Sequence, residues 1–224
     1  MSKKLLIKFK GHDKLSSSAI SHYLQQTDIN YAKLMIVQKI CTLIKDGVEP
    51  DSFVVASKSA ELFATKDSTY DDFENFEVLA RKEESAQKFW NIINRYHRPV
   101  VFYKKDNQHI PIFDYQDENR LIIRKLGVNS PVEVNLEGVG SSMVDLYYGA
   151  EREQRNRVQW ENEQIGQVAQ NINDITRASA TVNDPAVPEG VRSYAENILN
   201  QLMARQIKLN DEIGISDGTI SIIA

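Results

Sequence analysis

Residues 100–136 read VVFYKKDNQHIPIFDYQDENRLIIRKLGVNSPVEVNL, and this stretch decides the fold class. Four short runs in it are rich in β-branched and aromatic residues: 100–104, 109–113, 120–126 and 132–136. The turn-forming segments KDNQ, DYQDEN and GVNSP separate these runs. This spacing is typical of an antiparallel meander, in which consecutive strands pair with each other. We therefore predict a mostly antiparallel sheet in the middle of the chain.

The residues that open the chain predict a strand followed by two helices. LLIKFK at 5–10 alternates apolar and basic residues with the two-residue period of a half-buried strand. The hydroxyl groups of Ser16–Ser18 can cap a first helix. A second helix is predicted at about Tyr31–Lys45, with Gly47 as its C-cap.

Two further elements are predicted before the meander. FVVAS at 53–57 is a short apolar run that can form a buried strand. Residues 79–97 have a helical pattern that ends before Pro99, because a residue preceding proline avoids the helical conformation. Between them, residues 68–77 read STYDDFENFE, an acidic stretch with interleaved aromatic residues. This stretch predicts a solvated acidic face or a docking patch for a basic partner.

Beyond Gly149, apolar residues recur with the spacing of a coiled-coil heptad. The seam residues are Val158, Ile165, Val168, Ile172 and Ile175. The linker NDPAVPEG separates this helix from a second amphipathic helix over 189–213. The predicted apolar face of the second helix comprises Val191, Ala195, Ile198, Leu202, Leu209 and Ile213. The seam must be buried against that second helix or against another copy of the chain.

The predicted fold class is α+β: a mostly antiparallel sheet with packed helices, followed by a C-terminal long-helix hairpin and a terminal strand. The strand comes from GISDGTISIIA at the end of the sequence. We predict an α/β domain over 1–148, and a helical hairpin with the terminal strand over 149–224. If that strand returns to the first sheet, the two parts form one folding unit.

Composition narrows the classes of function. The 224 residues carry a net charge of −4, and we therefore expect no nucleic-acid partner. Cys41 is the single cysteine, which excludes an intrachain disulfide and a multi-cysteine metal site. No HExxH or HxH pattern occurs, and we expect neither a metal nor a cofactor. No apolar run is long enough for a membrane span or a signal peptide, which predicts a cytoplasmic protein.

The loop GVGSS at 138–142 can be interpreted in two ways. As a candidate ligand site, Gly138, Gly140, Ser141 and Ser142 would direct N–H and hydroxyl groups at a phosphate. The loop lacks the lysine of a Walker motif and the third glycine of a dinucleotide fingerprint. In the alternative interpretation, the glycines allow a turn and close packing, and a serine caps the next helix.

The stretch GSSMVD at 140–145 resembles the catalytic core of the polymerase-β-like nucleotidyltransferases over about six residues. That resemblance implies that Gly140 and Ser141 hold a triphosphate and that Asp145 holds Mg²⁺. Met143 stands where that family has its first metal-binding aspartate. Half of the metal-binding pair that the resemblance implies is therefore missing.

Basic residues with interleaved tyrosines surround the run 100–104. Arg98 and Lys104 are the candidate ligand-binding residues of this group, because cations beside aromatic rings suit a nucleotide. The other interpretation is an edge strand that its lysines protect from pairing.

These patterns favour a non-enzymatic interaction or scaffold protein. It would associate with itself, or dock a protein partner, through its C-terminal helices. The alternative is a nucleotide- or phosphate-binding module that uses the GVGSS loop, with a degenerate site like that of a nucleotidyltransferase. No sequence motif places a nucleophile beside a general base, and we therefore predict no catalytic residue.

Overall fold

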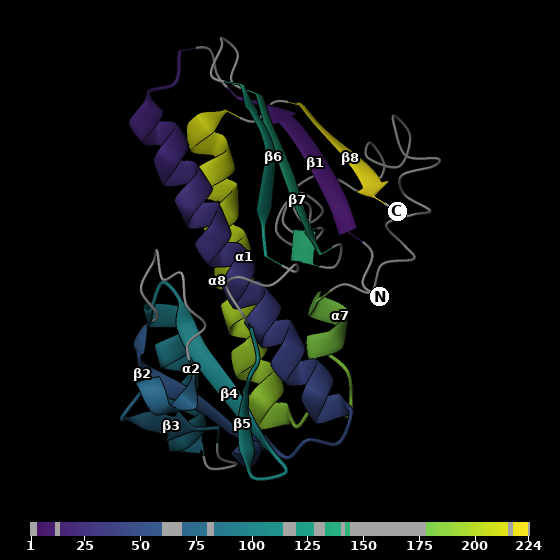
Figure 1. Cartoon of the computed structure of the whole chain (residues 1–224). Helices are drawn as coiled ribbons and strands as arrows, with labels where there is room; N and C mark the ends of the chain where they lie inside the picture. Colours follow the sequence, from purple (N-terminus) through teal and green to yellow (C-terminus); the bar gives the residue numbers. More distant parts are fainter. Residues whose placement is uncertain are drawn as a thin grey trace. The chain divides into compact units, whose positions relative to one another are not determined.

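The structure is a computed structural model. It describes residues 4–11, 14–59, 69–79, 83–113, 120–127, 133–139, 142–143, 178–214 and 217–223. Within these residues, helices are combined with two four-stranded antiparallel sheets (Figure 1), which confirms the predicted α+β class.

The chain divides into two compact units, which are described separately. Unit 1 takes its residues from 1–31, 119–177 and 202–224, and unit 2 from 32–118 and 178–201. Helix α1 (Ser17–Lys45) and helix α8 (Glu189–Ile213) each supply one part to each unit. The boundary predicted at 148–149 lies outside the described residues.

The sheet of unit 1 has the strand order β6-β7-β1-β8. These strands span Ile122–Gly127, Glu133–Val139, Lys4–Lys10 and Asp217–Ile223, in that order. Strand β1 pairs antiparallel with β7 on one side and with β8 on the other (Figure 1). The terminal strand therefore returns to the sheet that contains the first strand, as one of the two sequence interpretations proposed.

Helix α1 is one continuous helix of 29 residues, and the prediction of two helices is wrong. At its start, the backbone N–H of Ala19 donates to Oγ of Ser16 at 3.1 Å, so Ser16 is the N-cap. At its end, Gly47 has a φ of +95° and the N–H of Val48 donates to the carbonyl of Leu43 at 2.9 Å. This is a Schellman motif, which confirms Gly47 as the C-terminal stop.

The predicted break in α1 falls on polar residues that are buried against α8 in unit 1. Thr27, Asn30 and Gln206 are each no more than 2% exposed. Nδ2 of Asn30 donates to Oε1 of Gln206 at 3.1 Å, and Nε2 of Gln206 donates to Oγ1 of Thr27 at 3.1 Å. Oδ1 of Asn210 accepts from Nε2 of Gln206 at 3.1 Å and from the hydroxyl of Tyr23 at 3.2 Å. These five side chains form the α1–α8 polar ladder.

The sheet of unit 2 has the strand order β3-β2-β4-β5. These strands span Phe76–Val78, Phe53–Ser59, Pro99–Lys105 and Gln108–Pro111, in that order. Asp106 and Asn107 join β4 to β5 with φ values of 49° and 62°, the positive values of a type I′ hairpin turn. The predicted single meander is therefore wrong: β4 and β5 belong to this sheet, whereas β6 and β7 belong to the other.

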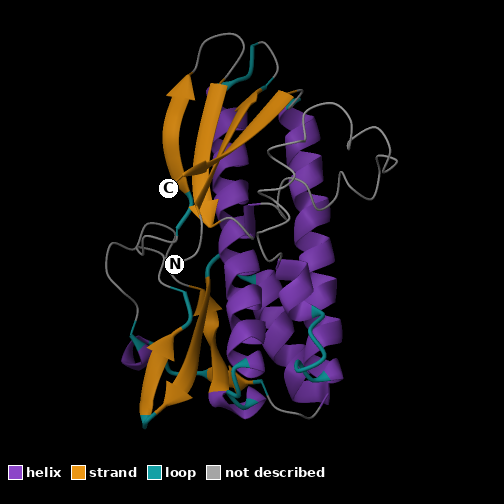
Figure 2. Cartoon of the chain, turned by 90° about the vertical axis from the view of Figure 1, so that its right-hand side faces the viewer, coloured by secondary structure: helices purple, strands orange, loops and turns teal. Residues whose placement is uncertain are grey.

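Helices cover one face of the unit 2 sheet (Figure 2). Helix α2 (Glu83–Arg95) packs against β2, β3 and β4, and its Phe89 and Ile93 are completely buried. The short helices of this unit are η1 (Pro50–Ser52), η2 (Tyr70–Asp72) and α7 (Ala178–Val182).

The predicted apolar face of α8 is confirmed, because all six of its residues are buried.

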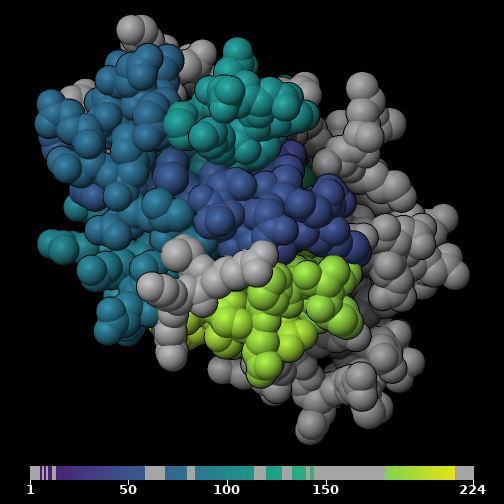
Figure 3. Space-filling view, turned by 90° about the horizontal axis from the view of Figure 1, so that it is seen from below, coloured from purple at the N-terminus to yellow at the C-terminus, as the bar shows by residue number. Residues whose placement is uncertain are grey.

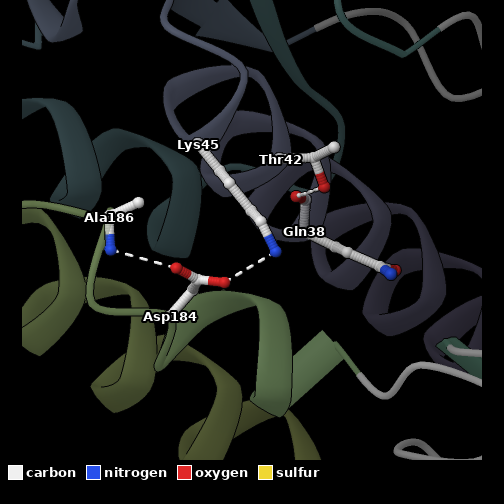
Figure 4. A network of polar contacts seen from close by, with 5 residues as sticks. All are labelled: Gln38, Thr42, Lys45, Asp184 and Ala186. Carbon is white, nitrogen blue, oxygen red and sulfur yellow. Dashed lines mark hydrogen bonds and ion pairs between the residues drawn. The ribbon is translucent and has the colours of Figure 1, made fainter.

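An ion pair joins the end of α1 to the turn between α7 and α8 (Figure 4). Nζ of Lys45 lies 2.6 Å from Oδ2 of Asp184, whose Oδ1 accepts from the N–H of Ala186 at 3.0 Å. The hydrogen bond from Lys45 lowers the pKa of Asp184, and the pKa of Lys45 is raised in turn by Asp184. In the view from below, the end of α1 in blue adjoins the α7–α8 segment in green (Figure 3).

Candidate functional site

Gly138, the first glycine of the predicted GVGSS loop, lies in strand β7 with Val139, so the loop prediction is wrong at these two positions. Gly138 also lies at a close approach of two side chains. A Cβ atom at this position would lie 2.8 Å from Sδ of Met143 and 2.9 Å from Cε2 of Tyr31. Both of these side chains are completely buried. A side chain larger than hydrogen at position 138 would therefore force its neighbours to move.

The next residue of the loop uses its backbone donor within the protein. The N–H of Val139 donates to the hydroxyl of Tyr31 at 2.7 Å, and this contact is buried. Ser142 is also completely buried. The described part of the loop thus packs against the interior of unit 1. Gly140 and Ser141 lie outside the described residues, and phosphate binding through them stays a prediction.

A buried carboxylate lies directly before the loop. Glu137 on β7 is 2% exposed and forms an ion pair with Arg124 of β6, which is more than half exposed. The hydrogen bond to Glu137 raises the pKa of Arg124. Glu133, Asn135 and Glu137 are the polar positions of the alternating pattern in β7, so sequence reasoning would place all three in solvent. The sequence contains no signal for the burial of Glu137.

Of the other predicted ligand residues, Arg98 directly precedes β4 and Lys104 lies near the far end of that strand, both in unit 2. Six residue steps separate them, which at about 3.3 Å per step is roughly 20 Å along the strand. Arg98 is partly buried and Lys104 is exposed. The structure therefore does not bring the two together. The edge interpretation of this strand is wrong, because β4 pairs with β2 on one side and β5 on the other.

The acidic stretch forms an aromatic cover over the second face of the unit 2 sheet. Tyr70, Phe73 and Phe76 pack against the buried Ala56, Val100 and Phe102. Tyr70 stacks on Phe76 with 4.3 Å between ring centroids, and on His109 with 3.6 Å between centroids. The half-buried ring of Tyr70 therefore lies between two other rings. Aromatic stacking of this kind fixes the position of a cover that has little backbone pairing of its own.

The carboxylates of the same stretch point away from that cluster. Asp71, Asp72 and Glu74 are exposed. Oδ2 of Asp72 accepts from the backbone N–H of Thr69 at 2.8 Å and from its Oγ1 at 2.9 Å, which caps the short helix η2. The alternation of aromatic and acidic residues thus separates a packed side from a solvated side. Docking of a basic partner on the solvated side stays a prediction.

The remaining sequence predictions concern the seam, Cys41, metal binding and membrane spans. All five seam residues, from Val158 to Ile175, lie outside the described residues. Cys41 is completely buried, and burial raises the pKa of its thiol to about 12, so it is not a reactive thiolate. Among the described residues, no three His, Cys, Asp or Glu side chains are grouped so that they could hold a metal ion. A search of the described helices finds none with the length and apolar character of a membrane span.

Comparison of the chain with protein-family models, with curated proteins and with solved structures finds no match.

Proposed function

We propose that this chain is a non-enzymatic interaction or scaffold protein. In this proposal, the helix predicted around residues 158–175 mediates association with a second copy of the chain or with a protein partner. The observation that carries the proposal is the position of the apolar stripe of α8, which packs against α1 in unit 1.

Leu202, Gln206, Leu209 and Ile213 form one stripe along α8, because they follow one another at intervals of four, three and four residues. All four are buried. Gln206 in the middle of the stripe makes its hydrogen bonds to Thr27 and Asn30 of α1. The stripe therefore faces α1 at Gln206, and this supports a partner other than this stripe for the predicted seam.

The predicted seam needs another apolar surface, because a helix with polar residues at most other positions is stabilised by burying its narrow stripe. A second copy of the same seam supplies a matching stripe, as in coiled-coil dimers. Self-association is therefore the first form of the proposal. Docking of a different amphipathic helix is the second.

Light scattering after gel filtration, at tens of micromolar protein, tests the proposal. We expect an oligomer for the unmodified chain and a monomer after Val158→Asp, Ile165→Asp and Ile172→Asp together. A control with the same number of added carboxylates at predicted outer positions is Gln159→Asp, Gln167→Asp and Asn173→Asp, and it should remain oligomeric. A monomeric unmodified chain would refute self-association, and helical peptides captured through the seam would then be the remaining form of the proposal.

A further inference from the structure

Strand β6 forms one edge of the unit 1 sheet, since it pairs with β7 on one side and ends the strand order there. Four consecutive residues of this strand, from Ile123 to Leu126, are exposed. Ile123 is 48% exposed and Leu126 is 41% exposed, which are high values for aliphatic side chains on a strand. An edge of this kind has N–H and C=O groups that are available to another strand.

The two exposed aliphatic residues share one face of the sheet. Ile123 is opposite Leu136, and Leu126 is opposite Val134. Leu136 and Val134 are two residues apart on β7, so they lie on the same face, and both are buried. The apolar row of this face therefore continues onto the edge strand and is open to solvent there.

Basic residues accompany this apolar row. Lys125 lies 3.5 Å from the carboxylate of Glu133, and Lys10 lies 3.9 Å from the same carboxylate. Arg124 is paired with Glu137. Lys10 lies on β1, beyond β7, so the two exposed cations of the edge strand itself are Arg124 and Lys125, each paired with one carboxylate of β7. Arg120, just before the strand, is also exposed and adds a further positive charge.

We propose that the β6 edge binds an extended segment of a partner protein in which aliphatic residues alternate with carboxylates. The segment adds a strand to the sheet: its backbone pairs with β6, its aliphatic side chains cover Ile123 and Leu126, and its carboxylates face the basic residues. A second copy of β6 fits less well. In antiparallel pairing across a two-fold axis, Arg124 and Lys125 would face basic residues of the other copy.

The bulge in β6 limits how the partner pairs. The pairing with β7 shifts register between Ile123 and Lys125, which leaves Arg124 as the extra residue. Bulges and lysines protect many edge strands from pairing. The exposed positions of a protected edge strand are usually polar, whereas β6 exposes Ile123 and Leu126. The expected backbone pairing therefore runs from Lys125 to Gly127, and the partner chain continues past the bulge so that one of its aliphatic side chains reaches Ile123.

The test uses two blocked seven-residue peptides, one alternating valine with glutamate and one alternating valine with lysine. Each carries a fluorescent label, and anisotropy is measured against the full chain at low and high salt. We expect the glutamate peptide to bind more tightly than the lysine peptide, and to bind more weakly as salt is added. Equal affinity for the two peptides would overturn the proposal, as would the absence of binding by the glutamate peptide.

Variants of the chain locate the site. Lys125→Glu should weaken binding of the glutamate peptide roughly threefold to tenfold, in line with cross-strand charge pairs. Ile123→Ser should weaken binding of the same peptide without a change in charge. Lys208→Glu makes the same charge change on the exposed face of α8 and should leave the affinity unchanged. Equal losses in Lys125→Glu and Lys208→Glu would show that only net charge matters, and would refute a site on β6. The seam variants change no residue of β6, so the peptide test and the oligomer test can fail separately.

Discussion

The α1–α8 polar ladder predicts a specific response to the loss of Gln206. The change Gln206→Met keeps a straight side chain of similar size but removes every hydrogen-bonding atom. Gln206 is completely buried and bonds to Thr27, Asn30 and Asn210. Its removal leaves the side-chain amide of Asn30, which is 2% exposed, without its acceptor on α8.

The loss of stability in Gln206→Met depends on whether each former partner of Gln206 can form another hydrogen bond. Oγ1 of Thr27 loses the donor Nε2 of Gln206, but its hydroxyl group can still donate to the carbonyl four residues earlier in its own helix. The side-chain amide of Asn30 donates to Gln206 on α8, and an unsatisfied buried amide costs about 1–3 kcal/mol. The free energy of unfolding should therefore fall by about 1–3 kcal/mol. For a chain of this size, Tm should fall by roughly 2–4 °C for each kcal/mol.

The double variant Asn30→Leu with Gln206→Met separates pairing from packing. Leucine has the same branched shape as asparagine, so the double variant replaces both polar partners with apolar groups of similar size. Replacing both partners is close to neutral, whereas removing one is costly. Urea unfolding followed by circular dichroism should show a midpoint near that of the unmodified chain. A double variant no more stable than Gln206→Met alone would refute the assignment of the cost to the amide of Asn30.

Variants at three further positions test other parts of the structure. Gly138→Ala should lower the free energy of unfolding, measured by urea unfolding, by about 1–3 kcal/mol, because the added methyl group overpacks its neighbours. An unchanged midpoint would show that position 138 can hold a methyl group without overpacking. His109→Ala removes the ring stacked on Tyr70 and should cost about 0.5–1.5 kcal/mol, whereas His109→Phe should restore most of it; equal losses would contradict a stacking role. Asp184→Asn should lower Tm at neutral pH and reduce the effect of salt. The pKa of Asp184 is lowered and that of Lys45 is raised, so the pair contributes to the stability of the fold between about pH 4 and 10. This contribution is lost as the pH falls through the folded pKa of the aspartate, or rises through the folded pKa of the lysine. A Tm difference between Asp184→Asn and the unmodified chain that does not shrink in acid would contradict this.

Local patterns predicted the elements that depend on neighbours in the sequence. The apolar face of α8 follows from a repeat of three and four residues, and all six predicted positions are buried. The β4–β5 hairpin follows from KDNQ, because aspartate and asparagine tolerate the positive φ values of its turn. The stop at Gly47 follows from the tolerance of glycine for the left-handed conformation.

Long-range partners caused the wrong predictions. Thr27 and Asn30 interrupt the apolar pattern of α1, where the sequence predicted a break between two helices. Their partner Gln206 is 176 residues beyond Asn30 in the sequence, so no local pattern shows that these polar residues are buried. The hairpins β4–β5 and β6–β7 were each predicted, but nothing local shows that they join different sheets. The burial of Glu137 is likewise invisible in an alternating strand, since only its ion pair with Arg124 makes that burial tolerable.

The α1–α8 polar ladder explains why α8 packs against α1 in one register, although leucine and isoleucine side chains could pack in several. A slip of α8 by one turn, about 5.4 Å, would still place leucine or isoleucine against apolar neighbours. The same slip would remove Gln206 from both Thr27 and Asn30 and leave buried amides without partners. We infer that the ladder fixes the register of α8 on α1, as a buried asparagine does in a coiled coil. A pair fixed in this way keeps Gln206 and its stripe on α8 against α1, and this supports our proposal that the helix predicted around 158–175 associates with a partner away from this stripe.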